Sequence, residues 1–215
     1  MKKQGSYLSL LKIRTLRGLL SLAVKGYFIE KGWLESYSKK QAIDQNGEPI
    51  PWLTYSFLDF INGRLNQNLT LFEYGSGNST LFFAKQLKYI KSIEYDSTWY
   101  NNLTALSLKN VSLSFIALDT ENESYETAIL REKQSYDIIL VDGRRRVKCT
   151  KLAVQKLNKN GIIILDDSER AAYSEVFSFM KEQGFKHLPF SGIAIGAIHN
   201  KCTSIFYRAD NVLGI

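Results

Sequence analysis

The chain has 215 residues, of which 45% are hydrophobic and 23% are charged, and this excludes a disordered chain and allows one domain with a short extension. The formal net charge is +7, but residues 1–40 hold nine Lys or Arg and two acidic residues, whereas residues 41–215 hold 19 of each. A nucleic-acid enzyme usually spreads positive charge over its active face, so this distribution does not favour a nucleic-acid partner.

The basic N-terminal segment predicts a helix over residues 6–30 that ends near Gly32. Its longest uncharged stretch, residues 18–24, is far shorter than the ~20 residues of a membrane-spanning helix. No cleavage site follows a clean apolar segment, so secretion is not expected. Two interpretations stay open: an amphipathic helix packed on the rest of the chain, or a basic helix resting on an acidic membrane or a protein partner.

The remaining sequence alternates between apolar runs and helical patterns. A turn-rich segment, 42–52, ends a basic helical extension (residues 1–52), and the single domain is expected over residues 53–215. After a helix at 53–65, we expect strands at 69–74, 90–95, 111–116, 136–141 and 161–165, and helices at 79–88, 97–108, 147–158 and 170–182. Such alternation predicts an α/β fold with a doubly wound, mostly parallel sheet. Two further strand-like runs, 184–190 and 202–208, have no helix between them and predict an antiparallel pair at one sheet edge.

The stretch LFEYGSGNST, residues 71–80, joins a predicted strand to a predicted helix through two glycines, Gly75 and Gly77. A turn with so few side chains lets a ligand lie against its backbone amides, although an ordinary strand-to-helix turn explains this stretch equally well by itself. Glu94 follows Gly75 by 19 residues, close to the ~20-residue spacing of a ribose-binding carboxylate. An ionised carboxylate can accept hydrogen bonds from both ribose hydroxyls.

The turn differs from a dinucleotide-binding motif because Thr80 stands where a third glycine would be. Glu73, two residues before Gly75, would repel a pyrophosphate and favour a cationic ligand. S-adenosylmethionine (SAM) carries an ammonium and a sulfonium group and no phosphate. The residues of the turn therefore favour SAM over NAD.

Five segments in this order, FEYGSGNST, SIEYDSTWY, YDIILVDGRRR, GIIILDDSER and TSIFYR, resemble class I SAM-dependent methyltransferases over residues 50–208. That family has a Rossmann-like sheet that ends with an antiparallel strand. The resemblance implies SAM as cofactor, with Gly75 and Gly77 under the methionine part and Glu94 on the ribose. Asp96 and Trp99 would flank the adenine. The cofactor-binding residues that it implies are Glu73, Gly75, Ser76, Gly77, Asn78, Ser79, Glu94, Asp96, Trp99, Asp119 and Asp142; for Asp119, a solvated loop carboxylate is an equal alternative.

Three carboxylates follow two neighbouring predicted strands: Asp142 after one, and Asp166 and Asp167 after the next. Crowded acids repel unless a cation or protons offset them, and oxygen-rich clusters suit Mg²⁺ or Mn²⁺. The arrangement resembles metal-dependent O-methyltransferases similar to catechol O-methyltransferase or macrocin O-methyltransferase. The three residues are therefore the candidate metal ligands and catalytic groups, with the metal lowering the pKa of an acceptor hydroxyl. The alternative is that Asp142 and Asp167 cap the following helices and Asp166 hydrogen-bonds locally.

The candidate acceptor-binding residues are Arg144 and Arg170, which could bind a phosphate or carboxylate, and Tyr55, which could form a pocket wall. Solvated arginines and a core tyrosine are the alternatives. The leading function is O-methylation of a small molecule, such as a sugar or glycan precursor. A nucleic-acid methyltransferase and a non-catalytic SAM-binding scaffold are the alternatives, although no Asn/Asp-Pro-Pro-Tyr signature occurs. The widely separated Cys149 and Cys202 indicate buried thiols in the cytoplasm, with peripheral membrane contact through the basic helix as an extension of that prediction.

Overall fold

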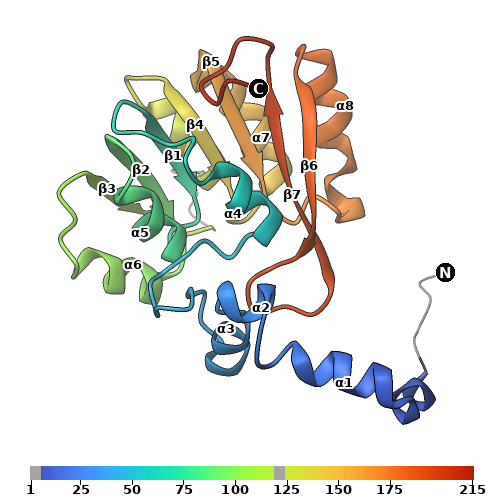
Figure 1. Cartoon of the computed structure of the whole chain (residues 1–215). Coiled ribbons are helices and arrows are strands. Elements are labelled where there is room, and N and C mark those ends of the chain that lie inside the picture. The colour runs from blue at the N-terminus through green and yellow to red at the C-terminus, as the bar shows by residue number, and fades with distance from the viewer. Residues whose placement is uncertain (1–5, 119–123) are drawn as a thin grey trace.

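A computed structural model of the chain describes residues 6–118 and 124–215, so Asp119 lies outside the described residues. A single mixed sheet, in the order β3-β2-β1-β4-β5-β7-β6, forms the centre of the molecule (Figure 1). The first five strands run parallel, as the doubly wound prediction requires, and the predicted fold class is confirmed. The strands are β1 (Thr70–Tyr74), β2 (Tyr89–Glu94), β3 (Val111–Phe115), β4 (Tyr136–Val141), β5 (Leu157–Leu165), β6 (Lys186–Ile193) and β7 (Asn200–Tyr207).

The strand register brings the candidate loops to one edge of the sheet. Tyr74 at the end of β1 lies opposite Ile93 of β2 and Val141 of β4, and Val141 lies opposite Leu165 of β5. Four parallel strands therefore end at the same level. The segments that follow them, which carry the glycine turn, Glu94 and the three strand-end acids, meet at this edge.

The last two strands form the predicted antiparallel pair. β7 is antiparallel both to β5 and to β6, and it lies between them. An isolated bridge between Thr54 and Ala194 joins the β6–β7 hairpin to the segment before the first helix of the main domain.

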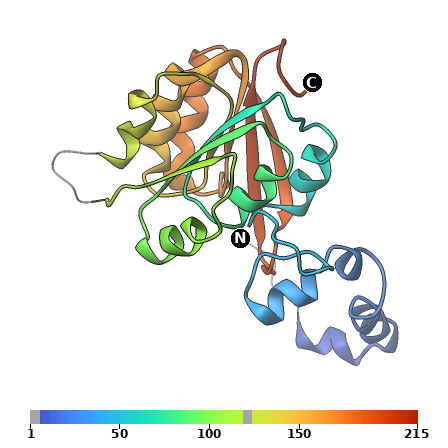
Figure 2. The ribbon, with the colours of Figure 1, turned by 90° about the vertical axis from the view of Figure 1, so that its left-hand side faces the viewer.

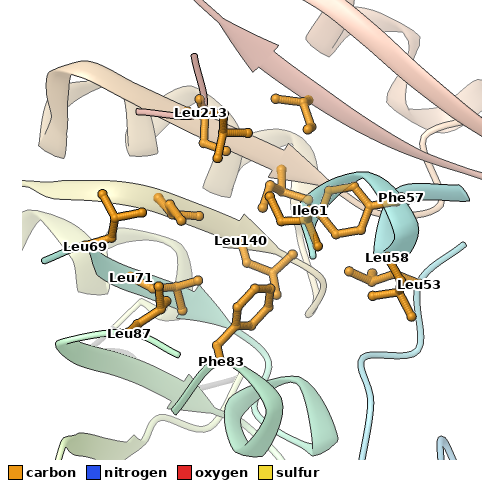
Figure 3. Packing of buried hydrophobic residues seen from close by; sticks show 14 of the residues in the cluster. Leu53, Phe57, Leu58, Ile61, Leu69, Leu71, Phe83, Leu87, Leu140 and Leu213 are labelled. Atoms are coloured by element: carbon orange, nitrogen blue, oxygen red, sulfur yellow. The ribbon is translucent and has the colours of Figure 1, made fainter. Parts of the chain in front are cut away.

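Helices cover both faces of the sheet, with α7 and α8 on one side and α4 on the other (Figure 2). Successive strand residues point to opposite faces, so Leu71 packs with Phe83 and Phe57 while its neighbour Phe72 packs with Cys149 and other residues of the second cluster. Figure 3 shows the first of these two clusters. Both cysteines are free and buried, as predicted. The covering helices and turns are α4 (Tyr55–Ile61), α5 (Asn78–Ala84), α6 (Ser97–Thr104), η2 (Tyr125–Arg131), α7 (Arg146–Ala153), η3 (Val154–Lys156), η4 (Ala171–Tyr173) and α8 (Ser174–Glu182).

The N-terminal segment differs from the single helix predicted over residues 6–30. It forms η1 (Tyr7–Leu11), α1 (Ile13–Ser21), α2 (Tyr27–Glu30) and α3 (Trp33–Lys39). Gly26 and Gly32 interrupt the helix because both have positive φ angles, +82° and +69°, which glycine adopts without steric cost. No residue from 6 to 31 is buried, so the expectation that an amphipathic helix here packs on the rest of the chain is wrong for η1 and α1.

All five other predicted helices are shorter than expected. Those predicted at 53–65, 79–88 and 170–182 are Tyr55–Ile61, Asn78–Ala84 and Ser174–Glu182. The helix predicted over 97–108 ends at Thr104, and Ser107 then turns the chain with a φ of +48°. The helix predicted over 147–158 ends at Ala153, because β5 already begins at Leu157. Within residues 6–118 and 124–215, no helix has both the length and the apolar composition needed to cross a membrane.

Candidate active site

A cavity of about 860 Å³ opens at the carboxyl ends of β1, β2 and β4. It brings together ten of the residues predicted from the sequence: Gly75, Ser76, Gly77, Asn78, Ser79, Glu94, Trp99, Asp142, Arg144 and Arg170. Part of its wall comes from the N-terminal extension, through Lys40–Ile43 and Trp52. The sequence therefore predicted most of the cavity floor, but not the contribution of the extension.

Five predicted site residues in the described part of the chain do not line this cavity. Asp96 caps α6, where its carboxylate accepts hydrogen bonds from the Thr98 and Trp99 amides at 2.8 and 3.2 Å. Tyr55 is 2% exposed and belongs to the core, so its interpretation as a wall of this cavity is wrong. Glu73, Asp166 and Asp167 are buried beneath the cavity edge.

The surroundings of Gly75 and Gly77, the two glycines of the turn, differ. Gly75 has a φ of +91°, and a Cβ there would lie 2.8 Å from the Cα of Gly143. Its lack of a side chain is therefore required by the fold itself. Gly77 has an extended φ of 169°, and no atom lies within 4 Å of where its Cβ would be. The open space beside Gly77 belongs to the cavity.

The buried Glu73 carboxylate holds the glycine turn in place through hydrogen bonds to the neighbouring elements. Its carboxylate is fully buried and accepts hydrogen bonds from the hydroxyls of Ser79, Thr80 (2.6 Å) and Ser92 (2.8 Å), which tie α5 and β2 to β1. Burial raises the pKa of Glu73 to about 7, although the three hydroxyls oppose this rise. Glu73 therefore shapes the turn and does not present a fixed negative charge to the cavity.

Glu94 connects the turn to the end of β2. One carboxylate oxygen accepts hydrogen bonds from the Ser76 amide (2.6 Å) and hydroxyl (3.0 Å). The other oxygen accepts from the amides of Tyr95 and Asp96, both at 2.8 Å. This side chain is 2% exposed and lies at the cavity wall. Four donors of the chain thus hold the carboxylate in one orientation, and its predicted role on a ribose remains a prediction.

Three cations compensate the strand-end acids, and one of them is Arg170, whose guanidinium lies 2.5 Å from Asp167. The Arg146 guanidinium lies 2.9 Å from Asp142, 3.2 Å from Asp167 and 3.7 Å from Asp166. The Lys201 ammonium, on β7, lies 3.2 Å from Asp166 and 2.6 Å from Asp167. The charge that the crowded acids require is therefore supplied by the chain itself.

This arrangement does not fit the predicted metal. Arg146 and Lys201 occupy the carboxylate oxygens that would bind Mg²⁺ or Mn²⁺, and Asp166 also accepts a hydrogen bond from the Thr203 hydroxyl at 2.8 Å. Over the two described ranges, no group of three or more His, Cys, Asp or Glu side chains is arranged to hold a metal ion. The proposed metal role of Asp142, Asp166 and Asp167 is therefore not retained.

Asp142 differs from the other two acids in its access to ligands. It lines the cavity, and 21% of its side chain is exposed, compared with 2% for Asp166 and 4% for Asp167. Burial, and next the negative charge of Asp166, raise the pKa of Asp142 well above its usual value. Burial also raises the pKa of Asp166. For Asp167, burial is opposed by the hydrogen bond from Lys201 and by the positive charges of Arg146, Lys201 and Arg170, which together lower its pKa. Asp142 is therefore the member of this group that can exchange a proton with a ligand.

Sequence reasoning missed several residues of the site. Lys201 lies 59 residues beyond Asp142, and only its polar position before a predicted strand could have indicated it. No sequence pattern indicated that Lys40–Ile43 would line the cavity. In the structure, the side-chain amide of Asn78 donates a hydrogen bond to the Ala42 carbonyl at 2.6 Å, and this bond connects the glycine turn to the extension. Trp52, which is 42% exposed, also lines the cavity.

Comparisons with known proteins were made at the level of sequence and of structure. No protein-family model matches the sequence, and no curated protein matches it. Among solved structures, the chain is similar to the precorrin-6y C5,15-methyltransferase of Geobacter metallireducens, with a TM-score of 0.54 at 15% identity over 71% of this chain and 87% of that one. A methyltransferase-like protein of Silicibacter pomeroyi gives 0.54 at 20% identity over 75% and 90%. An rRNA methylase of Streptococcus thermophilus gives 0.53 at 14% identity over 70% and 93%.

The chain has the Rossmann-like fold of methyltransferases. The sheet order, the antiparallel β7 and the similar structures agree on this point. In this methyltransferase fold, the cavity described above occupies the carboxyl ends of the strands, where ligands of doubly wound sheets bind.

Proposed function

We propose that the protein is a methyltransferase that binds SAM and methylates an oxygen of a small polar acceptor, such as a sugar or a glycan precursor. The observation that carries this proposal is the cavity itself, which joins the open space beside Gly77 to Glu94 on one side and to Asp142 on the other. Its volume of about 860 Å³ lies within the range of ligand pockets, roughly 300–1,000 Å³.

The cofactor half of the site fits SAM. The missing side chain at Gly77 leaves room for the methionine part. Glu94 lies at the cavity wall, where its carboxylate would accept hydrogen bonds from ribose hydroxyls in exchange for bonds that it now accepts from Ser76. Trp99, which is 46% exposed at the cavity, offers an apolar face to the adenine. Bound SAM would supply an electrophilic methyl group on its sulfonium.

The acceptor half of the site provides a base and three cations. Asp142 would accept the proton of an acceptor hydroxyl as that oxygen attacks the methyl carbon and the carbon–sulfur bond breaks, and its raised pKa makes it a stronger base than an ordinary aspartate. Arg144, Arg170 and Lys40 also line the cavity. They would bind a phosphate or carboxylate of the acceptor through charge-assisted hydrogen bonds. Trp52 would complete the wall.

The first experiment is a calorimetric titration of the full chain with SAM. We expect saturable binding with one site, and we expect Glu94→Ala to weaken it at least about tenfold because the ribose loses its acceptor. Glu182→Ala, on the exposed surface of α8, is the matched control and should bind SAM as the parent does. Absence of SAM binding by the folded parent would overturn the proposed function.

A further inference from the structure

The helix α1 exposes a complete apolar stripe to solvent. Ile13, Leu16 and Leu20 recur at helical spacing on one side, and Leu20 is 61% exposed and Ile13 is 67% exposed. Other large apolar side chains, exposed by 44% or more, continue the stripe before and after the helix: Tyr7, Leu8, Leu11, Leu22 and Val24. A nine-residue helix with no buried residue is marginal in water, so α1 needs an apolar surface to stabilise it.

The charges around this stripe have one sign. Arg17 borders the stripe, because it follows Ile13 by four residues and precedes Leu20 by three, and Arg14 is the second basic residue of α1. Lys12 and Lys25 flank the helix, and no acidic residue occurs between positions 6 and 29. The body of the chain, residues 41–215, is neutral, so the excess positive charge of the protein belongs to this segment and the residues next to it. An apolar stripe beside basic side chains is typical of a helix that lies in the interface of an anionic membrane.

We propose that η1 and α1 form a docking surface for an anionic lipid bilayer, with the apolar stripe in the acyl–headgroup boundary and Arg14 and Arg17 at the headgroups. A bilayer is favoured over an acidic protein because large exposed apolar side chains continue past both ends of α1, and basic side chains accompany them along the segment with no acidic residue from 6 to 29. This inference does not depend on the proposed chemistry, because it uses no residue of the cavity.

The docking surface is connected to the cavity. The Trp33 indole of α3 donates to the Ala197 carbonyl of the β6–β7 hairpin at 3.0 Å, and Lys31 pairs with Asp59 of α4. Residues Lys40–Ile43, directly after α3, line the cavity. Figure 1 shows α1, α2 and α3 together beyond one end of the sheet. Docking through α1 would therefore hold the cavity close to the bilayer surface.

The test is flotation of the full chain with vesicles of phosphatidylcholine alone and of phosphatidylcholine with phosphatidylglycerol. We expect binding only to the anionic vesicles, and weaker binding as salt is raised. Leu20→Gln should reduce the binding about tenfold, whereas Leu106→Gln, at a leucine of similar exposure (54%) on the body, should not change it.

Two double variants test the electrostatic contribution to vesicle binding. Arg14→Glu/Arg17→Glu should lower anionic-vesicle binding at least about thirtyfold, because each basic residue near the surface is worth roughly fivefold. Lys159→Glu/Lys181→Glu produces the same change in net charge on exposed positions of the body and should have little effect. All substituted residues are exposed, so thermal unfolding should be unchanged in each variant.

Three outcomes would overturn the proposal. One is absence of flotation with anionic vesicles, and another is equal binding to neutral vesicles. The third is a concentration-dependent dimer, lost in Leu20→Gln, with no vesicle binding, which would assign the apolar stripe to a second copy of the chain.

Discussion

Gly75 and Gly143 lie in such close contact that a Cβ on Gly75 would be 2.8 Å from the Cα of Gly143. The loops after β1 and β4 thus touch backbone to backbone, and the positive φ of Gly75 adds a second requirement for glycine. We expect Gly75→Ala to lower the free energy of unfolding by about 1–3 kcal/mol, measured by urea unfolding. An alanine variant as stable as the parent would contradict this account of the contact.

Gly77 provides the matched comparison, because nothing lies within 4 Å of where its Cβ would be. Gly77→Ala should therefore leave the free energy of unfolding within about 0.5 kcal/mol of the parent. It should weaken SAM binding at least about tenfold, because the added methyl group enters the cavity. Titrating Gly75→Ala and Gly77→Ala with SAM by calorimetry separates the role of Gly75 in folding from the role of Gly77 in cofactor binding. Unchanged SAM affinity in Gly77→Ala would count against the proposed cofactor position.

Glu73 should make stability depend on pH. Its folded pKa of about 7 lies above the ordinary value near 4.5, so between these pH values the folded protein holds a proton that the unfolded chain releases. The free energy of unfolding should therefore fall as the pH rises from about 4.5 to 7, by a total of roughly 3 kcal/mol from this group. Urea unfolding at several pH values should show a smaller fall in Glu73→Gln, and equal slopes for the two proteins would refute the assignment.

Lys201 should stabilise the folded protein by compensating the charge of the buried acids Asp166 and Asp167. Lys201→Met leaves Asp166 and Asp167 with less compensating charge, and we expect a loss of about 3 kcal/mol in the free energy of unfolding at pH 7. Acidification protonates Asp166, whose pKa is raised by burial, so the difference from the parent should shrink toward pH 4. The double variant Asp166→Asn/Lys201→Met should recover part of the loss, and Lys201→Arg should retain most of the stability. A loss below about 0.5 kcal/mol in Lys201→Met would show that Arg146 and Arg170 suffice to compensate the acids.

Asp142 should act on chemistry more than on cofactor affinity. Once an acceptor is found, Asp142→Asn should lower kcat by a factor of about 10²–10⁴ because the acceptor hydroxyl loses its base, while SAM affinity stays within about threefold. Asp210→Asn, at an exposed carboxylate, is the control. Equal losses in kcat and in SAM affinity would indicate that Asp142 binds the cofactor instead.

Local pattern was sufficient to predict the sheet and the floor of the cavity. The apolar runs ending at Tyr74 and Leu165 are strands in the structure, and their parallel pairing places the following loops at one edge. Gly75 and Glu94 could be recognised because the residues that define their environment lie within the same strand-turn-helix unit and the next strand.

Contacts between distant segments could not be predicted in the same way. The compensation of Asp166 by Lys201 depends on β7 lying next to β5, which no local spacing encodes. Gly26 and Gly32 show the other limit: helical periodicity continues through both, and only their positive φ angles reveal that the N-terminal segment is divided. The exposure of α1 also had no sequence signal, because an amphipathic stripe looks the same whether protein or another surface covers it.

Because β7 lies between β5 and β6, the strands cannot join the sheet in the order in which they are synthesised. β6 is synthesised before β7, yet it pairs only with β7 among the described strands, so it can join the sheet only after residues 200–207 have emerged. The same late strand brings Lys201 to the acids that end β5. A nascent chain that stops before position 200 would therefore have an unpaired β6, an open sheet edge at β5 and acids without Lys201 beside them. The candidate active site is completed only when residues 200–207 have emerged from the ribosome.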